Sequence, residues 1–238
     1  MRISMLLELK SKEILSDYRR TLVSFIKKSI SDFDDKLYSQ LYQKVSFIKP
    51  FTFAVKLKSP VFEDKVIHVN DKQIELNFST GDTILGIELY NAFLAQRKIP
   101  FAMPLGNEMI PVKVTISNTP QIDIDSAKIK FLSPLIVRKH NENNLDKYLY
   151  FGNDEFETEL FKIVQNELEK LCGMKIDNSE FRLIPVSPKK TVTSSMGIKF
   201  ACSIGIFEIS ASSEIINALY QYGIGSRRSE GFGMFDIL

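Results

Sequence analysis

The sequence predicts an α+β protein built from two tandem ferredoxin-like domains, each with the element order βαββαβ. Two observations lead to this prediction. Apolar residues alternate with a period of two in some segments and recur at helical spacing in others. The resulting order of strands and helices then occurs twice along 238 residues, a length that accommodates two small domains. We place the boundary near 118–126, which gives domains of 1–120 and 121–238.

The first half begins with the strand-like run RISMLLEL at 2–9. Ser16 or Asp17 is suited to cap the helix that follows, whose apolar face includes Leu22 and Ile30. The segment DDKLYSQLYQ then predicts a short second helix. The half is completed by strands at 51–57 and 73–79, a helix at about 82–94 and a strand at 111–117.

The second half repeats that order. AKIKFLSPLIVR is strand-like, a polar loop HNENNLDK follows, and residues 154–172 carry the apolar stripe of an amphipathic helix. Ser212 and Ser213 are suited to cap a further short helix. The remaining predicted elements are the strands FRLIPVS and GIKFACSIGIFEIS, the helix EIINALYQY and the closing strand GFGMFDIL.

Composition sets limits on function without selecting one. The net charge of +2 does not by itself establish nucleic-acid binding. No segment approaches the roughly 20 apolar residues of a membrane span, and the N-terminus lacks the pattern of a signal peptide; we therefore expect a cytoplasmic protein with no membrane partner. Cys172 and Cys202 have no CxxC spacing and only two histidines accompany them, so no metal or other cofactor is expected.

The segment GIGSRRSEGFGMF at 223–235 is the most unusual one in the chain. Neither the spacing of a Rossmann loop nor the Gly-Lys-Ser/Thr of a Walker A loop is present. Two interpretations remain: a structural turn, or a loop that admits a polyanion. Glycine allows positive φ and close approach of a ligand, and arginine gives forked hydrogen bonds to phosphate. The residues concerned are Gly223, Gly225, Gly231, Gly233, Arg227 and Arg228.

This pair of Gly-x-Gly motifs separated by five residues resembles the C-terminal glycine-rich loop of the RAMP superfamily of CRISPR-associated proteins. Further segments occur in the matching order: LYSQLYQ before FTFAVKL, then FLSPLIVR, then FETELFKIVQNELEKL. Within the superfamily the chain most resembles the endoribonucleases that cut CRISPR repeat RNA. The resemblance covers almost the whole chain, and that family also has two ferredoxin-like domains.

The resemblance implies metal-independent cleavage in the N-terminal domain. The 2′-hydroxyl beside the scissile phosphate attacks it and leaves a 2′,3′-cyclic phosphate. Many members place a histidine where this sequence has Tyr42, with a lysine or tyrosine on the first helix and a lysine in the next loop. The matching residues are Lys27 or Lys28 and Lys49. Because tyrosine and lysine titrate near 10 rather than near 6.5, slow cleavage is expected.

Each of these residues also has a structural interpretation. Tyr42 lies four residues after Tyr38 and could pack a helix face, Lys27 and Lys28 could belong to a solvated face, and Lys49 could be an ordinary loop residue. His68 and His140 lie outside the matching position, and we expect structural or surface roles for them.

The resemblance further implies that CRISPR repeat RNA is the partner and that the C-terminal domain binds it. Besides the glycine loop we expect contacts from Lys189 and Lys190, in a segment that we interpret as a linker between two strands; a plain linker is the alternative. The rival function is a RAMP subunit that holds CRISPR RNA, alone or in an effector complex, without cutting it. An unrelated ferredoxin-like protein is the third possibility. The chain could act as a monomer or a homodimer.

Overall fold

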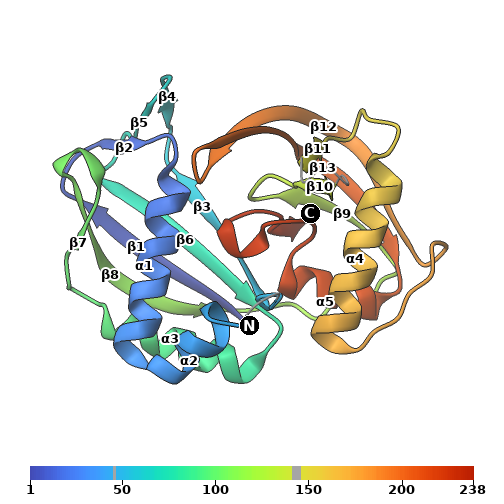
Figure 1. The fold of residues 1–238 in the computed structure, drawn as a ribbon, viewed down its shortest axis with the longest axis horizontal. Coiled ribbons are helices and arrows are strands. Elements are labelled where there is room, and N and C mark those ends of the chain that lie inside the picture. The colour runs from blue at the N-terminus through green and yellow to red at the C-terminus, as the bar shows by residue number, and fades with distance from the viewer. Residues whose placement is uncertain (45–46, 141–145) are drawn as a thin grey trace. The chain divides into compact units, whose positions relative to one another are not determined.

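The computed structural model of the chain describes residues 1–44, 47–140 and 146–238 and confirms the α+β class (Figure 1). The chain divides into two compact units. The first unit comprises Met1–Lys49, Val55–Thr119 and Ser194–Ile198, and the second comprises Pro50–Ala54, Pro120–Thr193 and Lys199–Leu238. Within the described ranges, no helix is both long enough and apolar enough to cross a membrane.

The first unit contains a five-stranded sheet in the order β3-β6-β1-β8-β7. Strand β1 lies in the middle and pairs antiparallel with both β6 and β8. With the short edge strand β7 set aside, this is the order of a ferredoxin-like sheet. The bounds are β1 (Arg2–Leu9), β3 (Phe51–Leu57), β6 (Gln73–Thr80), β7 (Phe101–Ala102) and β8 (Glu108–Ser117).

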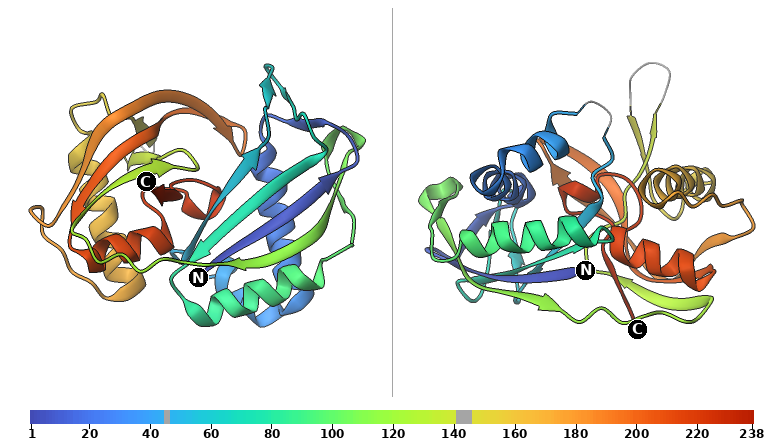
Figure 2. Two further views of the ribbon diagram at one scale, coloured as in Figure 1. Left: turned by 180° about the vertical axis from the view of Figure 1, so that it is seen from behind. Right: turned by 90° about the horizontal axis from the view of Figure 1, so that it is seen from below.

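Helices α1 (Tyr18–Phe33) and α3 (Thr83–Ala95) cover one face of that sheet (Figure 2). Phe25 of α1 stacks on Phe93 of α3 with ring centroids 6.5 Å apart, and Phe78 of β6 meets Phe93 edge to face. Fully buried aromatic rings therefore join both helices to the strands. A 3₁₀ turn, η1 (Pro104–Gly106), follows β7.

Helix α2 (Asp35–Tyr42) begins directly after α1 because Asp34 leaves the helical conformation. Asp34 is extended, with φ of −154°, and its Oδ1 accepts hydrogen bonds from the Lys36 and Leu37 backbone N–H groups. A capping carboxylate of this kind satisfies N–H groups that have no partner inside the helix. The new helix direction places Tyr42 as the last residue of α2.

A separate three-stranded sheet in the first unit was not predicted. Its order is β2-β5-β4, with β2 (Glu13–Leu15), β4 (Val61–Phe62) and β5 (Val66–His68). Strands of two or three residues are too short to show a period of two in the sequence. They extend the βαββαβ pattern without changing it.

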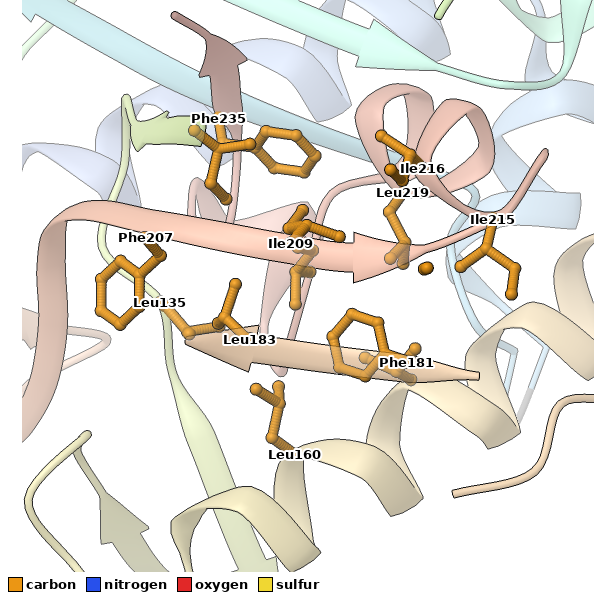
Figure 3. Close-up of a cluster of buried hydrophobic side chains, with 14 of the residues drawn as sticks. Leu135, Leu160, Phe181, Leu183, Phe207, Ile209, Ile215, Ile216, Leu219 and Phe235 are labelled. Atoms are coloured by element: carbon orange, nitrogen blue, oxygen red, sulfur yellow. The ribbon is translucent and has the colours of Figure 1, made fainter. Parts of the chain in front are cut away.

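The second unit repeats the sheet order of the first, as β12-β13-β9-β14. Helices α4 and α5 and the inner faces of these strands form one apolar core (Figure 3). Leu160 from α4, Ile216 and Leu219 from α5, and Phe207 and Ile209 from β13 are all almost completely buried. The bounds are β9 (Ser126–Phe131), α4 (Phe156–Cys172), β12 (Phe181–Ser195), β13 (Ile198–Ala211), α5 (Ser213–Tyr222), η2 (Arg228–Glu230) and β14 (Phe235–Ile237).

Two local predictions in the second unit are corrected. The run 127–138 is not one strand: β9 ends at Phe131, and Leu132 and Ser133 bend to donate backbone hydrogen bonds to the Met234 carbonyl. A hairpin of β10 (Val137–His140) and β11 (Asp146–Leu149) then follows. Its ends occupy part of the predicted loop 140–147, while residues 141–145 lie outside the described residues.

Candidate active site and nucleic-acid interface

Tyr42 lies between two lysine side chains in the first unit. The Lys27 Nζ, from α1, is 5.0 Å from the centre of the Tyr42 ring, and the Lys49 Nζ, from the segment after α2, is also 5.0 Å from it. Both distances fall within the range of a cation–π interaction. The structure therefore brings together three of the four predicted catalytic residues. We call Lys27, Tyr42 and Lys49 the tyrosine–lysine cluster.

The phenol of the cluster has a shifted pKa. Burial, with a smaller contribution from Tyr38, raises the pKa of Tyr42 above its ordinary value of 10. The phenol is therefore protonated at neutral pH, and its O–H group is available as a hydrogen-bond donor. Tyr38 stacks on Tyr42 with ring centroids 5.3 Å apart. The four-residue spacing of the two tyrosines in α2 thus gives the ring packing expected from the structural interpretation of Tyr42.

Lys28 does not join the cluster, in contrast to the prediction that included it. Its Nζ donates to Asp32 Oδ1 and Oδ2 at 2.9 and 2.8 Å, one turn further along α1. Since adjacent helical residues lie about 100° apart around the axis, Lys27 and Lys28 cannot face the same neighbour. The i,i+4 spacing of Lys28 and Asp32 is the sequence signal that could have distinguished them.

The two histidines interact with carboxylates on other elements. His68 Nε2 lies 3.2 Å from Oε1 of Glu63, in the turn between β4 and β5, and its Nδ1 lies 3.6 Å from Oε1 of Glu13, in β2. His140 Nδ1 lies 2.8 Å from Asp146 Oδ1 in the β10–β11 hairpin. These contacts agree with structural or surface roles for both residues.

The four glycines of segment 223–233 are buried, and three of their backbone N–H groups donate hydrogen bonds within the protein. The N–H groups of Gly223, Gly231 and Gly233 donate to the carbonyl groups of Leu219, Arg228 and Pro134, at 2.8, 3.0 and 2.9 Å. These three donors are thus not open to a phosphate, as the polyanion interpretation had required. Gly225 is buried as well.

Close packing explains why glycine occupies these positions. A Cβ at Gly225 would lie 2.5 Å from Leu135 Cδ1 and 2.6 Å from the Ile136 carbonyl oxygen, and one at Gly233 would overlap the Ile224 carbonyl oxygen. Both glycines also have positive φ, 90° and 73°, a conformation that side chains disfavour. The glycine pairs hold the loop against the core of the second unit.

Arg228 is a buried structural residue, contrary to the expected phosphate contact. It is 4% exposed, its Nε donates to Glu167 Oε1 at 3.0 Å, and its Nη1 donates to the Tyr222 carbonyl at 2.8 Å. Burial raises the pKa of Glu167 to about 7 in spite of the attraction of Arg228. Glu167 is a partner that sequence analysis missed, because nothing in the spacing of 61 residues indicates the contact.

Arg227 lies at the loop corner and is partly accessible. Its Nη1 donates to Glu230 Oε2 at 2.8 Å and its Nη2 to the Tyr148 hydroxyl at 2.9 Å. Burial works against the charge of Arg227, but these two bonds outweigh it and raise its pKa. The Tyr148 ring stacks on Phe200 with centroids 4.6 Å apart. Arg227 is therefore the loop cation that is held in place next to aromatic rings.

Lys189 and Lys190 lie in the middle of β12 rather than in a linker, which corrects that prediction. Both side chains are exposed. The Lys190 Nζ lies 4.0 Å from the centre of the Tyr150 ring. The second unit thus presents two adjacent lysines on a regular strand, with an aromatic ring against one of them.

Comparisons with known proteins agree with this architecture. The family model described as "CRISPR associated protein Cas6, C-terminal" matches residues 117–237, slightly more than half of the chain. The chain is 24% identical over 229 residues to Cas6nc of Pyrococcus horikoshii, a CRISPR-associated endoribonuclease-like protein, covering 87% of this chain and 92% of that protein.

Solved structures show the same fold over the full length. A Cas6-related protein from Pyrococcus furiosus has a TM-score of 0.86 and 20% identity, covering 100% of this chain and 98% of that one. A RAMP protein described as binding different RNA substrates has a TM-score of 0.86 and 18% identity, covering 100% of this chain and 99% of that one. At this identity the likeness establishes the double ferredoxin-like fold alone.

Proposed function

Because the chain belongs to the Cas6 family of CRISPR-associated proteins, we propose that it is a metal-independent endoribonuclease that cleaves CRISPR repeat RNA during precursor processing. The observation that carries the proposal is the tyrosine–lysine cluster, in which two ammonium groups lie 5.0 Å from the ring of one protonated tyrosine. Such a set suits a reaction that builds negative charge on a phosphate and must protonate a leaving oxygen.

In the proposed reaction the ribose 2′-hydroxyl attacks the neighbouring phosphorus and displaces the 5′-oxygen of the next nucleotide. The products are a 2′,3′-cyclic phosphate and a free 5′-hydroxyl. The ammonium groups of Lys27 and Lys49 stabilise the charge of the pentacoordinate phosphorane, and the Tyr42 hydroxyl supplies a proton to the leaving oxygen. Positioning the 2′-hydroxyl for in-line attack supplies the rest of the rate enhancement.

Burial raises the pKa of Tyr42, so the protonated phenol does not take the proton of the 2′-hydroxyl at neutral pH. In the proposed reaction the attacking 2′-hydroxyl loses this proton to solvent hydroxide. We accordingly propose a slow enzyme. The N-terminal domain, residues 1–120 in the sequence-based division, carries the cleavage site.

For RNA contact we propose Lys189 and Lys190 on β12, together with Arg227, all in the C-terminal domain, residues 121–238. The two lysines are exposed on one strand, and Arg227 is fixed by Tyr148 and Glu230. Lysine and arginine contacts to the phosphate backbone position RNA without reading its sequence. The four glycines and Arg228 are buried and are not included among the contacts.

One observation favours a second function, the binding of CRISPR RNA without cleavage. By the resemblance, Tyr42 stands where many members of the family place a histidine, and burial moves the pKa of Tyr42 further from neutrality. Under this alternative the same lysines would hold a phosphate that is never cut. A structurally similar RAMP protein is described as binding different RNA substrates, which is compatible with either function.

The test is cleavage of end-labelled repeat RNA under single-turnover conditions in EDTA, beside RNAs with one 2′-deoxy substitution at each candidate site. Cleavage that persists in EDTA and stops with one deoxy substitution supports the proposal. Tight binding with no cleavage supports the second function. The absence of binding to any repeat RNA would exclude both functions.

Variants of the cluster then assign the residues. We expect Tyr42→Phe, Lys27→Ala and Lys49→Ala each to reduce the single-turnover rate by about 10- to 1,000-fold. Lys28→Ala is the matched control, because it removes the same charge from the adjacent position of α1, where the side chain pairs with Asp32. An equal loss of rate in Lys28→Ala would show that the cluster has no special role.

A further inference from the structure

Strand β12 forms one edge of the sheet in the second unit. Among the strands that the structure describes, its only neighbour is β13. Successive residues of a strand direct their backbone N–H and C=O groups to opposite sides, so about half of these groups on β12 point away from β13. A sheet edge of this kind can pair with an added strand.

The first part of β12 is the part that is suited to such pairing. Pro185 and Pro188 have no backbone N–H group, and proline protects a sheet edge against a further strand. The segment of the strand before both prolines is 181–184. Lys189 and Lys190, proposed above as RNA contacts, lie after both prolines, so the two surfaces occupy different parts of β12.

A pocket of about 410 Å³ lies between the segment 181–184 and the N-terminal half of α4. Its floor is apolar, since Leu160 of α4 and Phe181 and Leu183 of β12 are buried. Figure 3 shows Leu160 next to the strand that carries Phe181 and Leu183. Glu157 and Arg182 are exposed and contribute to a polar rim. A volume of this size falls within the range of ligand sites, so a strand added at this edge would place side chains at the mouth of a usable pocket.

The charges around the pocket are mainly acidic. Glu157 lines it, and Asp177 and Glu180, in the segment directly before β12, are exposed. The hydroxyl and backbone N–H of Ser179 donate to Asp177 and lower the pKa of its carboxyl, which is therefore ionised at neutral pH. Among the described residues that line the pocket, Arg182 is the only basic one. A segment that docks here is complementary in charge when it carries lysine or arginine.

We propose that the groove between the start of β12 and the N-terminal half of α4 binds an extended, basic segment of a partner protein, which joins the sheet as an added strand. The backbone of that segment exchanges hydrogen bonds with 181–184, and one of its apolar side chains enters the pocket above Leu160. Its lysine or arginine side chains face Glu157 and the acidic segment before β12. Such binding takes affinity from main-chain hydrogen bonds and specificity from side-chain pockets. The inference does not rest on the nuclease proposal.

Fluorescence anisotropy with a synthetic peptide is the first test. The probe is a fluorescein-labelled peptide of eight residues in which valine and lysine alternate, and the comparison peptide has glutamate in place of lysine. We expect the lysine peptide to bind with a dissociation constant of about 100 µM or lower, and the glutamate peptide to bind at least about tenfold more weakly. If the lysine peptide does not bind at protein concentrations up to about 1 mM, the proposal is wrong.

A charge reversal in the rim tests the position of the site. We expect Glu157→Lys to weaken binding of the lysine peptide by about tenfold or more. Glu214→Lys is the matched control, because Glu214 is also an exposed glutamate in the first turn of a helix of the second unit, but on α5. Equal weakening by the two variants would show that the peptide responds to net charge, which would contradict a site at this groove.

N-methylation of the peptide tests whether it binds as a strand. One version of the lysine peptide is methylated at all valine amides and another at all lysine amides, so that each keeps its charge and loses the N–H groups of one side. We expect one of the two to bind about tenfold or more weakly, because its methyl groups would lie against β12. Equal binding by both versions and the unmodified peptide would exclude strand addition. Light scattering with and without peptide is the last measurement: a dimer that the peptide dissociates would assign the groove to a second copy of the chain and overturn the proposal.

Discussion

Arg228 donates a hydrogen bond from Nε to Glu167 Oε1 across 3.0 Å, with both side chains largely buried in the second unit. The second carboxylate oxygen, Glu167 Oε2, is buried and has no hydrogen-bond partner among the described residues. Burial therefore dominates the environment of this carboxyl and raises its pKa to about 7. The pair fixes the glycine loop to α4, and its protonation state is coupled to stability.

We predict that this pair makes folding less favourable as the pH rises. Glu167 binds its proton more tightly in the folded state, so its contribution is complete below pH 4.5 and is lost as the pH rises to about 7. A shift of this size corresponds to about 3 kcal/mol at most. Urea unfolding at pH 5 and pH 8 is the measurement.

Glu167→Gln is the comparison, because it keeps the shape and removes the titration. The wild-type protein should lose up to about 3 kcal/mol more than the variant between pH 5 and pH 8. If the two proteins lose the same stability, Glu167 titrates with an ordinary pKa and the buried pair is not pH-sensitive.

A second prediction concerns Gly233 in the loop. An added Cβ would overlap the Ile224 carbonyl oxygen, and φ is 73°, so Gly233→Ala should reduce the free energy of unfolding by about 3 kcal/mol or more. Gly173→Ala is the control: it has φ of 71° and no atom within 4 Å of the added Cβ, so it isolates the backbone cost of about 1 kcal/mol.

Chemical denaturation of both variants decides between packing and backbone strain. Equal destabilisation would mean that positive φ alone explains the glycine. If Gly233→Ala were stable but bound RNA weakly, the polyanion interpretation of the glycines would return.

Periodicity predicted the main elements of the fold closely. Strands β1 and β3 have the bounds expected from RISMLLEL and FTFAVKL, and α3 and α4 differ from the predicted helices only at their ends. These segments are long enough for alternation or a helical stripe to be visible. The break after Phe131 was missed because apolar residues resume directly after Ser133 and Pro134. Pro134 has no N–H for a strand ladder, and Leu132 and Ser133 donate to the carbonyl of the distant Met234.

The candidate sites were less predictable, since they depend on contacts between distant residues. Tyr42 and Lys49 were predicted from resemblance to a family. No pattern in the sequence shows that Lys27 and Lys49 both lie against the Tyr42 ring. The glycines were conspicuous in the sequence, but glycine is required there because of contacts with Ile224 and with Leu135, which lies ninety residues before Gly225. Arg227 and Arg228 are adjacent in sequence, yet one lies at the loop corner and the other is buried. Tertiary packing decided their roles.

The raised pKa of Tyr42 predicts a particular pH dependence of cleavage. Because solvent hydroxide takes the proton of the 2′-hydroxyl in the proposed reaction, the single-turnover rate should increase steadily from pH 6 to pH 9, without a plateau near 6.5. Tyr42 remains protonated throughout because burial and Tyr38 raise its pKa. A bell-shaped profile with an apparent pKa near 6.5 would instead indicate a histidine in the reaction.

The last prediction concerns the lysines of β12. If Lys189 and Lys190 contact RNA phosphates, replacing both with alanine should weaken binding of repeat RNA and reduce the slope of log K against log salt by about 1 to 2. The charge-matched control replaces Lys162 and Lys175, which are exposed in the same unit but pair with Glu159 and Glu169. Fluorescence anisotropy at several salt concentrations measures both slopes. Since the two double variants lose the same net charge, an equal change in slope would show that RNA binding responds to the overall charge of the protein. Only a larger change in the β12 variant would support contact between RNA phosphates and this strand.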